Sequence, residues 1–310
     1  MPEQPHEGLL NRAEAVTHAE LHYGKQINLL KDLANYGSNL VVRAYHSSPK
    51  GMADLVICGV LLKQVAAMTD ATEVLISAGC GNAAFLPNRA AFEASIYLDW
   101  MLVGDSELKA KRYVVANYRD QQEWARRATP GSAEEAELKK LMHPFGIDVH
   151  ANNPSLATTA ADGVTEANRV LSQPALASID QAFSNARKPG RNYDVEWYAL
   201  DGLKSIRQVA DKVGRLAEYD FFYSRGSQVM HTGTYTDHML MSKEKGAVRF
   251  KSMRHLEDVH FLVQFTASIC VGTYRKILDR YRPAERAAFN EKYLSDWREP
   301  FLNIVRVSYK

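Results

Sequence analysis

A stripe of side chains that can carry acid–base chemistry recurs at every fourth position between residues 215 and 231. It consists of Tyr219, Tyr223, Ser227 and His231. If this segment is a helix, each four-residue step turns the position by about 40°, so the four polar tips share one slowly drifting face. The histidine at its end has an ordinary pKa near neutrality and can take or give a proton. The same groups can instead hydrogen-bond to one another inside a core, and both interpretations stay open.

An arginine six residues before this histidine adds a group that binds phosphate oxygens through paired N–H donors. On an unbroken helix, Arg225 and His231 are about 120° apart. They converge only if Gly226 loosens the turn or the arginine side chain wraps around the helix. The spacing also recurs by chance, so it does not select its own site; the matching pairs are Arg12/His18, Arg225/His231, Arg249/His255 and Arg254/His260.

Two charged residues lie one turn apart in the otherwise apolar segment 82–103. Arg89 and Glu93 share this segment with a single further charge, Asp99. A helix that is apolar on nearly all sides belongs in the interior. Its charges therefore need partners, because removing one member of a buried pair costs several kcal/mol. The two residues are either an ion pair that locks two helices together or a clamp that orients a catalytic residue.

The strongest local positive charge follows His231. The whole chain has 38 basic and 36 acidic residues, a net charge of +2, so no global field attracts nucleic acid. Residues 243–254 nevertheless have a net charge of +4. Most such runs are solvated surface, but an RNA backbone bound near His231 would pass this segment. The residues expected to bind RNA are Lys243, Lys245, Arg249, Lys251 and Arg254.

The sequence contains none of the common motifs for metal or nucleophilic catalysis. No HExxH motif, clustered metal ligands or nucleophile elbow is present. Cys58, Cys80 and Cys270 are far apart and lack the paired spacing of a zinc site. Their odd number in apolar surroundings suits buried free thiols in a reducing compartment. We therefore expect no metal and no cofactor.

The N-terminus and the apolar runs indicate a soluble, cytoplasmic protein. The first residues are polar, without the basic and apolar regions of a signal peptide. The longest strongly apolar run, Leu55 to Leu62, ends at Lys63. A membrane-spanning helix needs roughly 20 such residues. We expect no association with a membrane.

Composition and periodicity predict an all-α protein. Of 310 residues, 46% are hydrophobic and only 29 are glycine or proline, so turn-formers are scarce. The only strand pattern lies near residues 238–252, where two short runs flank the polar turn Lys243–Gly246 and predict a small β-hairpin. The expected helices cover residues 9–47, 52–78, 82–103, 106–128, 132–142, 163–187, 203–213, 215–231 and 254–281, with a short one after Pro283 and a break in the first near Tyr36-Gly37-Ser38.

The chain is expected to form a single helical domain over residues 1–310. A long N-terminal helix, 9–47, would precede a core at about 50–281, and residues 282–310 would form a C-terminal extension. Residues 144–162 have loop chemistry followed by small residues. The alternative is two subdomains divided at that stretch.

The order of three short motifs resembles a known bacterial family. Arg-Ala-Ala-Phe-Glu at 89–93 is followed by Trp197-Tyr198 and then by Tyr223-x3-Ser227-x3-His231. This order is similar to the helical domain-of-unknown-function family numbered 5677 and, more distantly, to HEPN-type domains (higher eukaryotes and prokaryotes nucleotide-binding). The resemblance covers roughly residues 50–281. One departure is Gly226, where HEPN ribonucleases favour a polar residue.

Similarity to HEPN proteins implies a multi-helix bundle and often a metal-independent endoribonuclease. Such enzymes act in phage defence, toxin–antitoxin or abortive-infection systems and commonly form homodimers in which two Arg/His motifs face one cleft. By position, Arg225 and His231 would be catalytic here, while Tyr223, Ser227, Arg89 and Glu93 would support them. Expected partners are RNA, a second copy of the chain and an antitoxin or defence-operon protein. The alternative is a non-catalytic helical protein that binds a nucleotide, RNA or a protein partner, as a sensor does.

Overall fold

A computed structural model describes residues 9–148, 150–151, 153, 155–187, 194–230, 238–241 and 248–308, the side chains of 240, 241 and 249 excepted. The chain divides into two compact units, each described by itself below. Unit 1 consists of residues 1–103 and 206–310, and unit 2 consists of residues 104–205. Unit 2 is thus inserted between two segments of unit 1. The stretch 144–162, considered above as a boundary, lies inside unit 2, and folding as a single domain stays a prediction.

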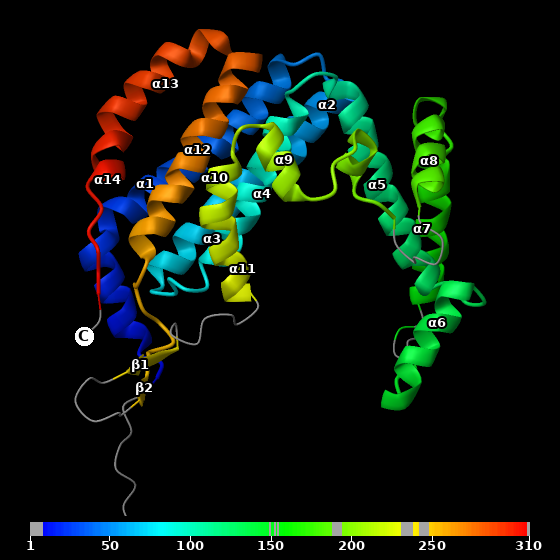
Figure 1. The fold of residues 1–310 in the computed structure, drawn as a ribbon, viewed down its shortest axis with the longest axis horizontal. Helices are drawn as coiled ribbons and strands as arrows, with labels where there is room; N and C mark the ends of the chain where they lie inside the picture. Colours follow the sequence, from blue (N-terminus) through cyan, green and yellow to red (C-terminus); the bar gives the residue numbers. More distant parts are fainter. Residues whose placement is uncertain are drawn as a thin grey trace, which may run out of the picture. The chain divides into compact units, whose positions relative to one another are not determined.

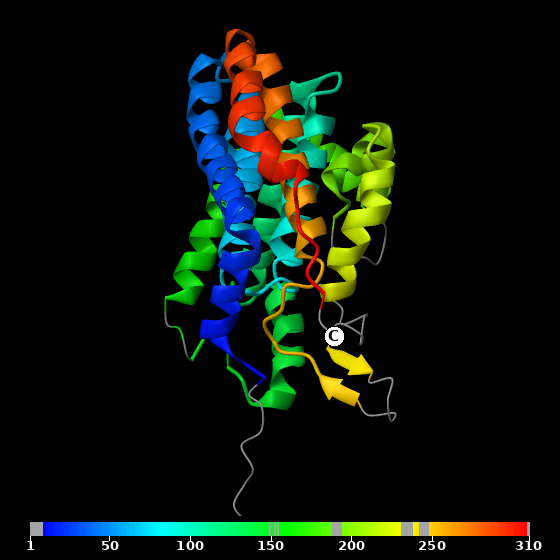
Figure 2. The ribbon, with the colours of Figure 1, turned by 90° about the vertical axis from the view of Figure 1, so that its left-hand side faces the viewer.

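Unit 1 is a bundle built on four long helical segments, so the all-α prediction is confirmed for this unit (Figures 1 and 2). Helix α1 (Arg12–Ser47) packs against α3 (Lys63–Ser77) and α12 (Val259–Tyr281), and α4 (Phe85–Met101) packs against both α3 and α12. The elements are α1 (Arg12–Ser47), α2 (Met52–Asp54), the π-helix η1 (Leu55–Leu62), α3 (Lys63–Ser77), α4 (Phe85–Met101), α9 (Ile206–Lys212), α10 (Leu216–Glu218), the π-helix η4 (Tyr219–Tyr223), α11 (Ser224–Met230), β1 (Met239–Met241), β2 (Val248–Phe250), α12 (Val259–Tyr281), the 3-10 helix η6 (Pro283–Glu285), α13 (Arg286–Lys292), the π-helix η7 (Tyr293–Trp297) and α14 (Arg298–Leu302).

Helix α1 runs unbroken through the glycine where a break was expected. Gly37 is buried, and its missing side chain leaves room for Tyr274 of α12. The Tyr274 hydroxyl donates to the Leu33 carbonyl at 2.9 Å. A Cβ at residue 37 would lie 2.7 Å from Tyr274 Cζ and 3.1 Å from Ala66 Cβ. Gly37 therefore serves the close contact of α1 with α12 and α3 rather than a turn, and the predicted break is wrong.

The segment Met52–Ser77, made of α2, η1 and α3, forms the apolar core of unit 1. Among the described residues it is one helical stretch long and apolar enough to cross a membrane, by length and composition only. Its most apolar 18-residue window is 56% buried, and the segment packs against α1 and α4. Core helices of soluble proteins have the same properties.

Helix α12 begins five residues later than its sequence pattern predicts. The backbone of His255 pairs with Cys80 in an isolated parallel bridge, and Gly81 N–H donates to the His255 carbonyl at 3.3 Å. Asp258, just before the helix, has a φ of 62°. This left-handed conformation is one that aspartate adopts more readily than most residues. Long-range pairing thus holds the segment before Val259 out of the helix.

Two short strands precede that bridge. β1 and β2 pair antiparallel, with Met239 opposite Phe250 and Met241 opposite Val248 (Figure 2). The pairing continues where Lys251 N–H donates to the His238 carbonyl at 2.8 Å. The turn expected at Lys243–Gly246 lies outside the described residues, so the complete hairpin stays a prediction.

The C-terminal residues 282–302 form short helices that pack on α1. Trp297 is buried, and its indole N–H donates to Asp32 of α1 at 2.7 Å. Lys292 pairs with the same carboxylate at 2.7 Å. Tyr36 contacts the Trp297 ring edge-on, with centroids 5.3 Å apart. The extension is therefore part of the bundle of unit 1.

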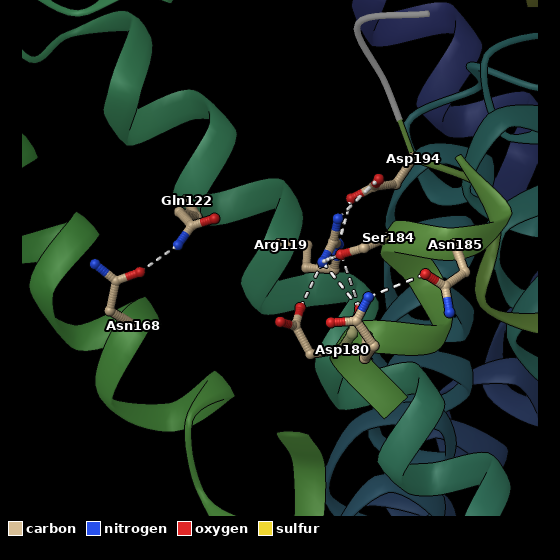
Figure 3. A network of polar contacts seen from close by, with 8 residues as sticks. Arg119, Gln122, Asn168, Asp180, Ser184, Asn185 and Asp194 are labelled. Carbon is tan, nitrogen blue, oxygen red and sulfur yellow. Dashed lines mark hydrogen bonds and ion pairs between the residues drawn. The ribbon is translucent and has the colours of Figure 1, made fainter. Parts of the chain in front are cut away.

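Unit 2 is also helical, and Arg119, whose side chain is only 12% exposed, holds three of its segments together. The guanidinium of Arg119 donates to Asp194 at 2.6 and 3.2 Å and to Ser184 at 3.1 Å, and it pairs with Asp180 (Figure 3). The arginine lies on α5 (Ser106–Arg127), and its partners come from α8 (Pro174–Ala186) and from the segment before the 3-10 helix η3 (Trp197–Asp201). The elements are α5 (Ser106–Arg127), α6 (Ala133–Met142), the 3-10 helix η2 (His143–Phe145), α7 (Leu156–Leu171), α8 (Pro174–Ala186) and the 3-10 helix η3 (Trp197–Asp201).

The loop expected over residues 144–162 is shorter than predicted. Helix α7 begins at Leu156, because the small residues that follow are good helix formers and Ala160 is buried. The single helical pattern predicted for 163–187 is split by Pro174, which begins α8. Proline fits the first turn of a helix, where no N–H donor is needed, but not its interior.

Candidate functional site

The predicted site stands on two helices of unit 1 that approach closely. α10, η4 and α11 form one continuous helical stretch, residues 216–230, which packs on α4. Gly226 is buried at this contact, and a Cβ there would lie 2.9 Å from Arg89 Cβ and 3.2 Å from the Phe85 carbonyl oxygen. The glycine that departs from the HEPN pattern therefore serves the packing of α11 on α4.

Arg89 and Glu93 meet on the hydroxyl of Tyr223. Arg89 donates to the phenol oxygen at 2.6 Å, and the hydroxyl donates to Glu93 at 3.3 Å. The Arg89 guanidinium also lies over the Tyr223 ring, 4.2 Å from its centroid, and 3.5 Å from the sulfur of Met230. Burial raises the pKa of the Tyr223 phenol, and the hydrogen bond from Arg89 partly offsets this rise. The structure thus brings three of the predicted supporting residues together.

The aromatic half of the predicted stripe is aligned by a change in helix type. Tyr219 and Tyr223 bound the π-helical turn η4, and their rings stack with centroids 4.5 Å apart. A π-helix has more residues per turn than an α-helix, so residues four apart overlap more closely along the axis. Burial also raises the pKa of Tyr219. Both phenols are therefore neutral hydrogen-bonding groups at physiological pH.

Arg225 points toward the start of α12. Its guanidinium lies 3.3 Å from the Asp258 carboxylate and 5.4 Å from the centroid of the Phe85 ring. The Arg225 side chain is 24% exposed, so it is reachable from solvent. Its partner Asp258 was not identified from the sequence. The only local signal for it is an acidic residue directly before the apolar helix pattern, which suits a helix N-terminus.

The histidine proposed as catalytic, His231, lies outside the described residues. Helix α11 is described through Met230, the residue before it. Ser227 is half-buried on the same helix. The contact of Arg89 with the Met230 sulfur places a guanidinium beside the end of α11, where the segment with the histidine begins.

Two of the predicted RNA-binding residues are engaged by groups of the protein. Lys251 pairs with Glu257, and its side chain is only 9% exposed. Arg254 donates to the Ala78 carbonyl oxygen at 2.8 Å. These contacts reduce the positive charge that the described part of the segment offers to a phosphate backbone. Lys243 and Lys245, and the side chain of Arg249, lie outside the described residues.

A cluster of charged residues around the buried Asp99 lies near the predicted site, and the sequence indicated only part of it. Asp99 of α4 is buried and accepts from Arg215 at 2.9 Å, while Lys276 of α12 lies 2.7 Å from its other oxygen. Arg215 also donates to Ser95 at 2.9 Å and to Glu218 at 2.6 Å. The sequence marks Asp99 as a charge in an apolar helix, but not its distant partners.

Above this cluster, a pocket of about 550 Å³ opens between the helical stretch 216–223 and α12. Phe222 and Phe265 stack in its wall with ring centroids 3.6 Å apart. Gly272 also lines it, and a Cβ there would meet nothing within 4 Å. Its lining combines the aromatic Phe222 and Phe265 and the apolar Ile269 with polar and charged side chains, namely Gln264, Ser268, Thr273, Arg215, Glu218 and Lys276.

A second pocket of about 470 Å³ lies in unit 2 beside the Arg119 cluster. Trp124 is exposed there, with the Arg127 guanidinium 4.5 Å from its ring centroid. The same helix carries Gln122, which donates to Asn168 of α7 at 2.6 Å (Figure 3). Its lining includes Trp197 of the Trp197-Tyr198 motif but none of the predicted catalytic, supporting or RNA-binding residues.

Within the part of the chain that the structure describes, no group of three or more His, Cys, Asp or Glu side chains is placed to hold a metal ion. Cys58 and Cys270 are buried free thiols, and burial raises the pKa of both, to about 12 and about 11. Thiols with such pKa values are protonated and unreactive at neutral pH.

Comparison with known proteins gives a single family. The searches for curated relatives and for solved structures found no significant match. The model of one family, described as a family of unknown function, matches residues 54–247. The matched region contains α4, all of unit 2 and the helical stretch 216–230. Because it spans well over half of the sequence, this chain belongs to the DUF5677 family.

Proposed function

We propose that this chain is a metal-independent endoribonuclease with a HEPN-like bundle. The observation that supports the proposal most directly is the position of two guanidinium groups around the end of α11. Arg89 reaches Met230 from α4, and Arg225 stands on α11 itself beside Asp258. His231 follows Met230 in the chain. Arg225 and His231 would supply the guanidinium and the imidazole that metal-free RNA cleavage uses, and Arg89 would add a second cation from α4.

The proposed reaction is an internal transesterification of RNA. His231 takes the proton of a ribose 2′-hydroxyl, the 2′-oxygen attacks the adjacent phosphorus, and the P–O5′ bond breaks as the 5′-oxygen takes that proton back from His231. The products are a 2′,3′-cyclic phosphate and a 5′-hydroxyl. The guanidinium of Arg225 binds the phosphate oxygens and stabilises their increased charge in the transition state. Arg89 and Glu93 fix Tyr223, which with Ser227 orients the imidazole.

The biological setting follows the HEPN resemblance. We propose a cytoplasmic protein of a bacterial defence, toxin–antitoxin or abortive-infection system, acting as a homodimer in which two sites face one cleft. A partner from the same operon would restrain or trigger the activity. Gel filtration of the purified chain tests the dimer, since a strict monomer would remove the shared cleft.

The decisive experiment is incubation of the purified chain with single-stranded RNA in the presence of EDTA. We expect cleavage, and a loss of more than 100-fold in rate in His231→Ala and in Arg225→Ala. The chain supplies a matched control, because Arg12 and His18 have the same spacing on α1. The double variant Arg12→Ala/His18→Ala should keep full activity.

Two outcomes would contradict the ribonuclease. Unaltered RNA would do so, as would cleavage that His231→Ala leaves undiminished, because the activity would then come from another site or a contaminant.

The second candidate is a non-catalytic binding or sensor protein. The engagement of Lys251 by Glu257 and of Arg254 by Ala78 favours it, because the first contact neutralises a positive charge and the second occupies a guanidinium donor on the expected RNA path. Under this alternative, His231→Ala leaves the biological effect of the protein in cells intact while RNA stays uncut.

A further inference from the structure

We infer that the 550 Å³ pocket of unit 1 binds one unpaired nucleobase of the RNA, next to the position of the scissile phosphate. The choice of an RNA base as occupant rests on the proposed ribonuclease function. The pocket itself is independent of that function, since none of its lining residues belongs to the proposed catalytic set.

The walls of the pocket suit a flat ring. Phe222 and Phe265 stack on each other, so a base would pack against the outer face of this pair, beside Ile269, rather than between the two rings. Bases that are not paired in a duplex bind proteins by packing against aromatic and apolar side chains. The volume of about 550 Å³ lies within the range of small-molecule sites and exceeds what one base needs.

The charges at the pocket edge favour an uncharged occupant. Arg215 donates to Asp99 and Glu218, and Lys276 pairs with Asp99, so two cations are balanced by two carboxylates. An anionic or cationic ligand would unbalance this cluster, whereas a base brings no net charge. The amide of Gln264, also in the lining, carries both a donor and an acceptor for a base edge.

The end of the pocket formed by Phe222 and Gln264 is the one nearest to the proposed site along both helices. Phe222 precedes Arg225 by three residues, about 4.5 Å along the axis, and Gln264 follows Asp258 by six, about 9 Å. Arg225 and Asp258 are themselves in contact at 3.3 Å. A phosphate held at Arg225 therefore places the neighbouring base at the pocket mouth.

The glycine in α12 keeps the pocket open and provides the test. Gly272 lines the pocket, and a Cβ there would meet only open space, so a larger side chain fills the pocket without displacing the core. We expect Gly272→Phe to block the pocket and Gly272→Ala, its matched control, to leave it open. Gln264→Ala tests the edge contacts by a different route.

The experiment is calorimetric titration of the full chain with adenosine, guanosine, cytidine and uridine. We expect at least one nucleoside to bind the unmodified chain and Gly272→Ala equally, and to bind Gly272→Phe at least tenfold more weakly. Gln264→Ala should change the order of preference among the four. Thermal unfolding of Gly272→Phe and Gln264→Ala shows whether each variant is folded. A change in nucleoside binding supports the inference only when the variant that shows it is folded.

Absence of nucleoside binding, or binding that Gly272→Phe leaves unchanged in a folded protein, would overturn the inference. The ribonuclease proposal is tested by separate outcomes. RNA cleavage in EDTA that depends on His231, without nucleoside binding, rejects the pocket alone. Nucleoside binding blocked by Gly272→Phe, without RNA cleavage, rejects catalysis alone.

Discussion

Two helix-interior glycines of unit 1 should respond to alanine with opposite signs. Alanine is about 1 kcal/mol more favourable than glycine inside a helix. At Gly272 of α12 a new Cβ meets nothing within 4 Å, so Gly272→Ala should stabilise unit 1 by about 1 kcal/mol. At Gly37 of α1 the new Cβ would lie 2.7 Å from Tyr274 Cζ, within a core that lacks space for it.

The size of the Gly37→Ala effect follows from how firmly its neighbour is held. Tyr274 is fully buried, bonds to the Leu33 carbonyl at 2.9 Å and packs against the Tyr36 ring with centroids 5.7 Å apart. It cannot move aside without losing these contacts. Overpacking of this kind costs about 1–3 kcal/mol. After the helix preference of alanine, about 1 kcal/mol, is subtracted, we expect Gly37→Ala to be less stable than the unmodified chain by up to about 2 kcal/mol.

Urea unfolding followed by circular dichroism measures both changes in the same unit. The two variants should differ by about 1–3 kcal/mol, the sum of opposite shifts. Combining Gly37→Ala with Tyr274→Phe removes the phenol oxygen from the contact, so the double variant should be more stable than the sum of the single effects predicts. A Gly37→Ala protein as stable as Gly272→Ala would refute the claim that α1 and α12 meet closely at this glycine.

Three further predictions concern packing and charge. Gly226→Val should push α11 away from α4 and destabilise unit 1 by about 1–3 kcal/mol in urea unfolding, because its Cβ would press on Arg89. Asp99→Asn should cost about 3 kcal/mol in the same assay, since it leaves the buried Arg215 poorly compensated; a neutral result would mean the cluster is dispensable. Bonds from Lys139, the Gly131 N–H and His150 lower the pKa of Glu135 from 4.5 to about 2. This stabilisation is complete above pH 4.5 and is lost as the pH falls toward 2, so Glu135→Gln should flatten the acid-unfolding curve in that window.

The helical class and most helix positions could be predicted because they depend on local periodicity. The apolar pattern of α4 and the aromatic pattern of residues 216–230 are properties of neighbouring residues, and both appear as helices. The predicted break at Gly37 is wrong because glycine can either end a helix or allow another helix to approach closely. Here it allows the contact with Tyr274, which lies on a helix more than 200 residues later. The predicted start of α12 is wrong for the same reason, because the bridge between His255 and Cys80 is a long-range contact.

For the candidate site, the sequence predicted which charged residues require partners, but it did not identify every partner. Charges in the apolar α4 showed that Arg89, Glu93 and Asp99 required partners. Tyr223 was expected near the first two, and the structure places its hydroxyl between them. The partner of Asp99 is 116 residues away at Arg215, and no periodicity links the two positions. Pairing across such distances is set by the packing of helices, which a single sequence does not encode locally.

The insertion of unit 2 between the two halves of unit 1 fixes an order of events during synthesis. Chains are made from the N-terminus, and segments fold as they emerge from the ribosome. α1, α3 and α4 leave the ribosome first, yet α12, which fills the space against all three, follows only after the whole of unit 2. The apolar surface of the early helices must therefore stay uncovered for the time taken to translate more than 150 further residues. A nascent chain halted at residue 205 should expose that surface to chaperones and proteases, while one released after residue 281 should not.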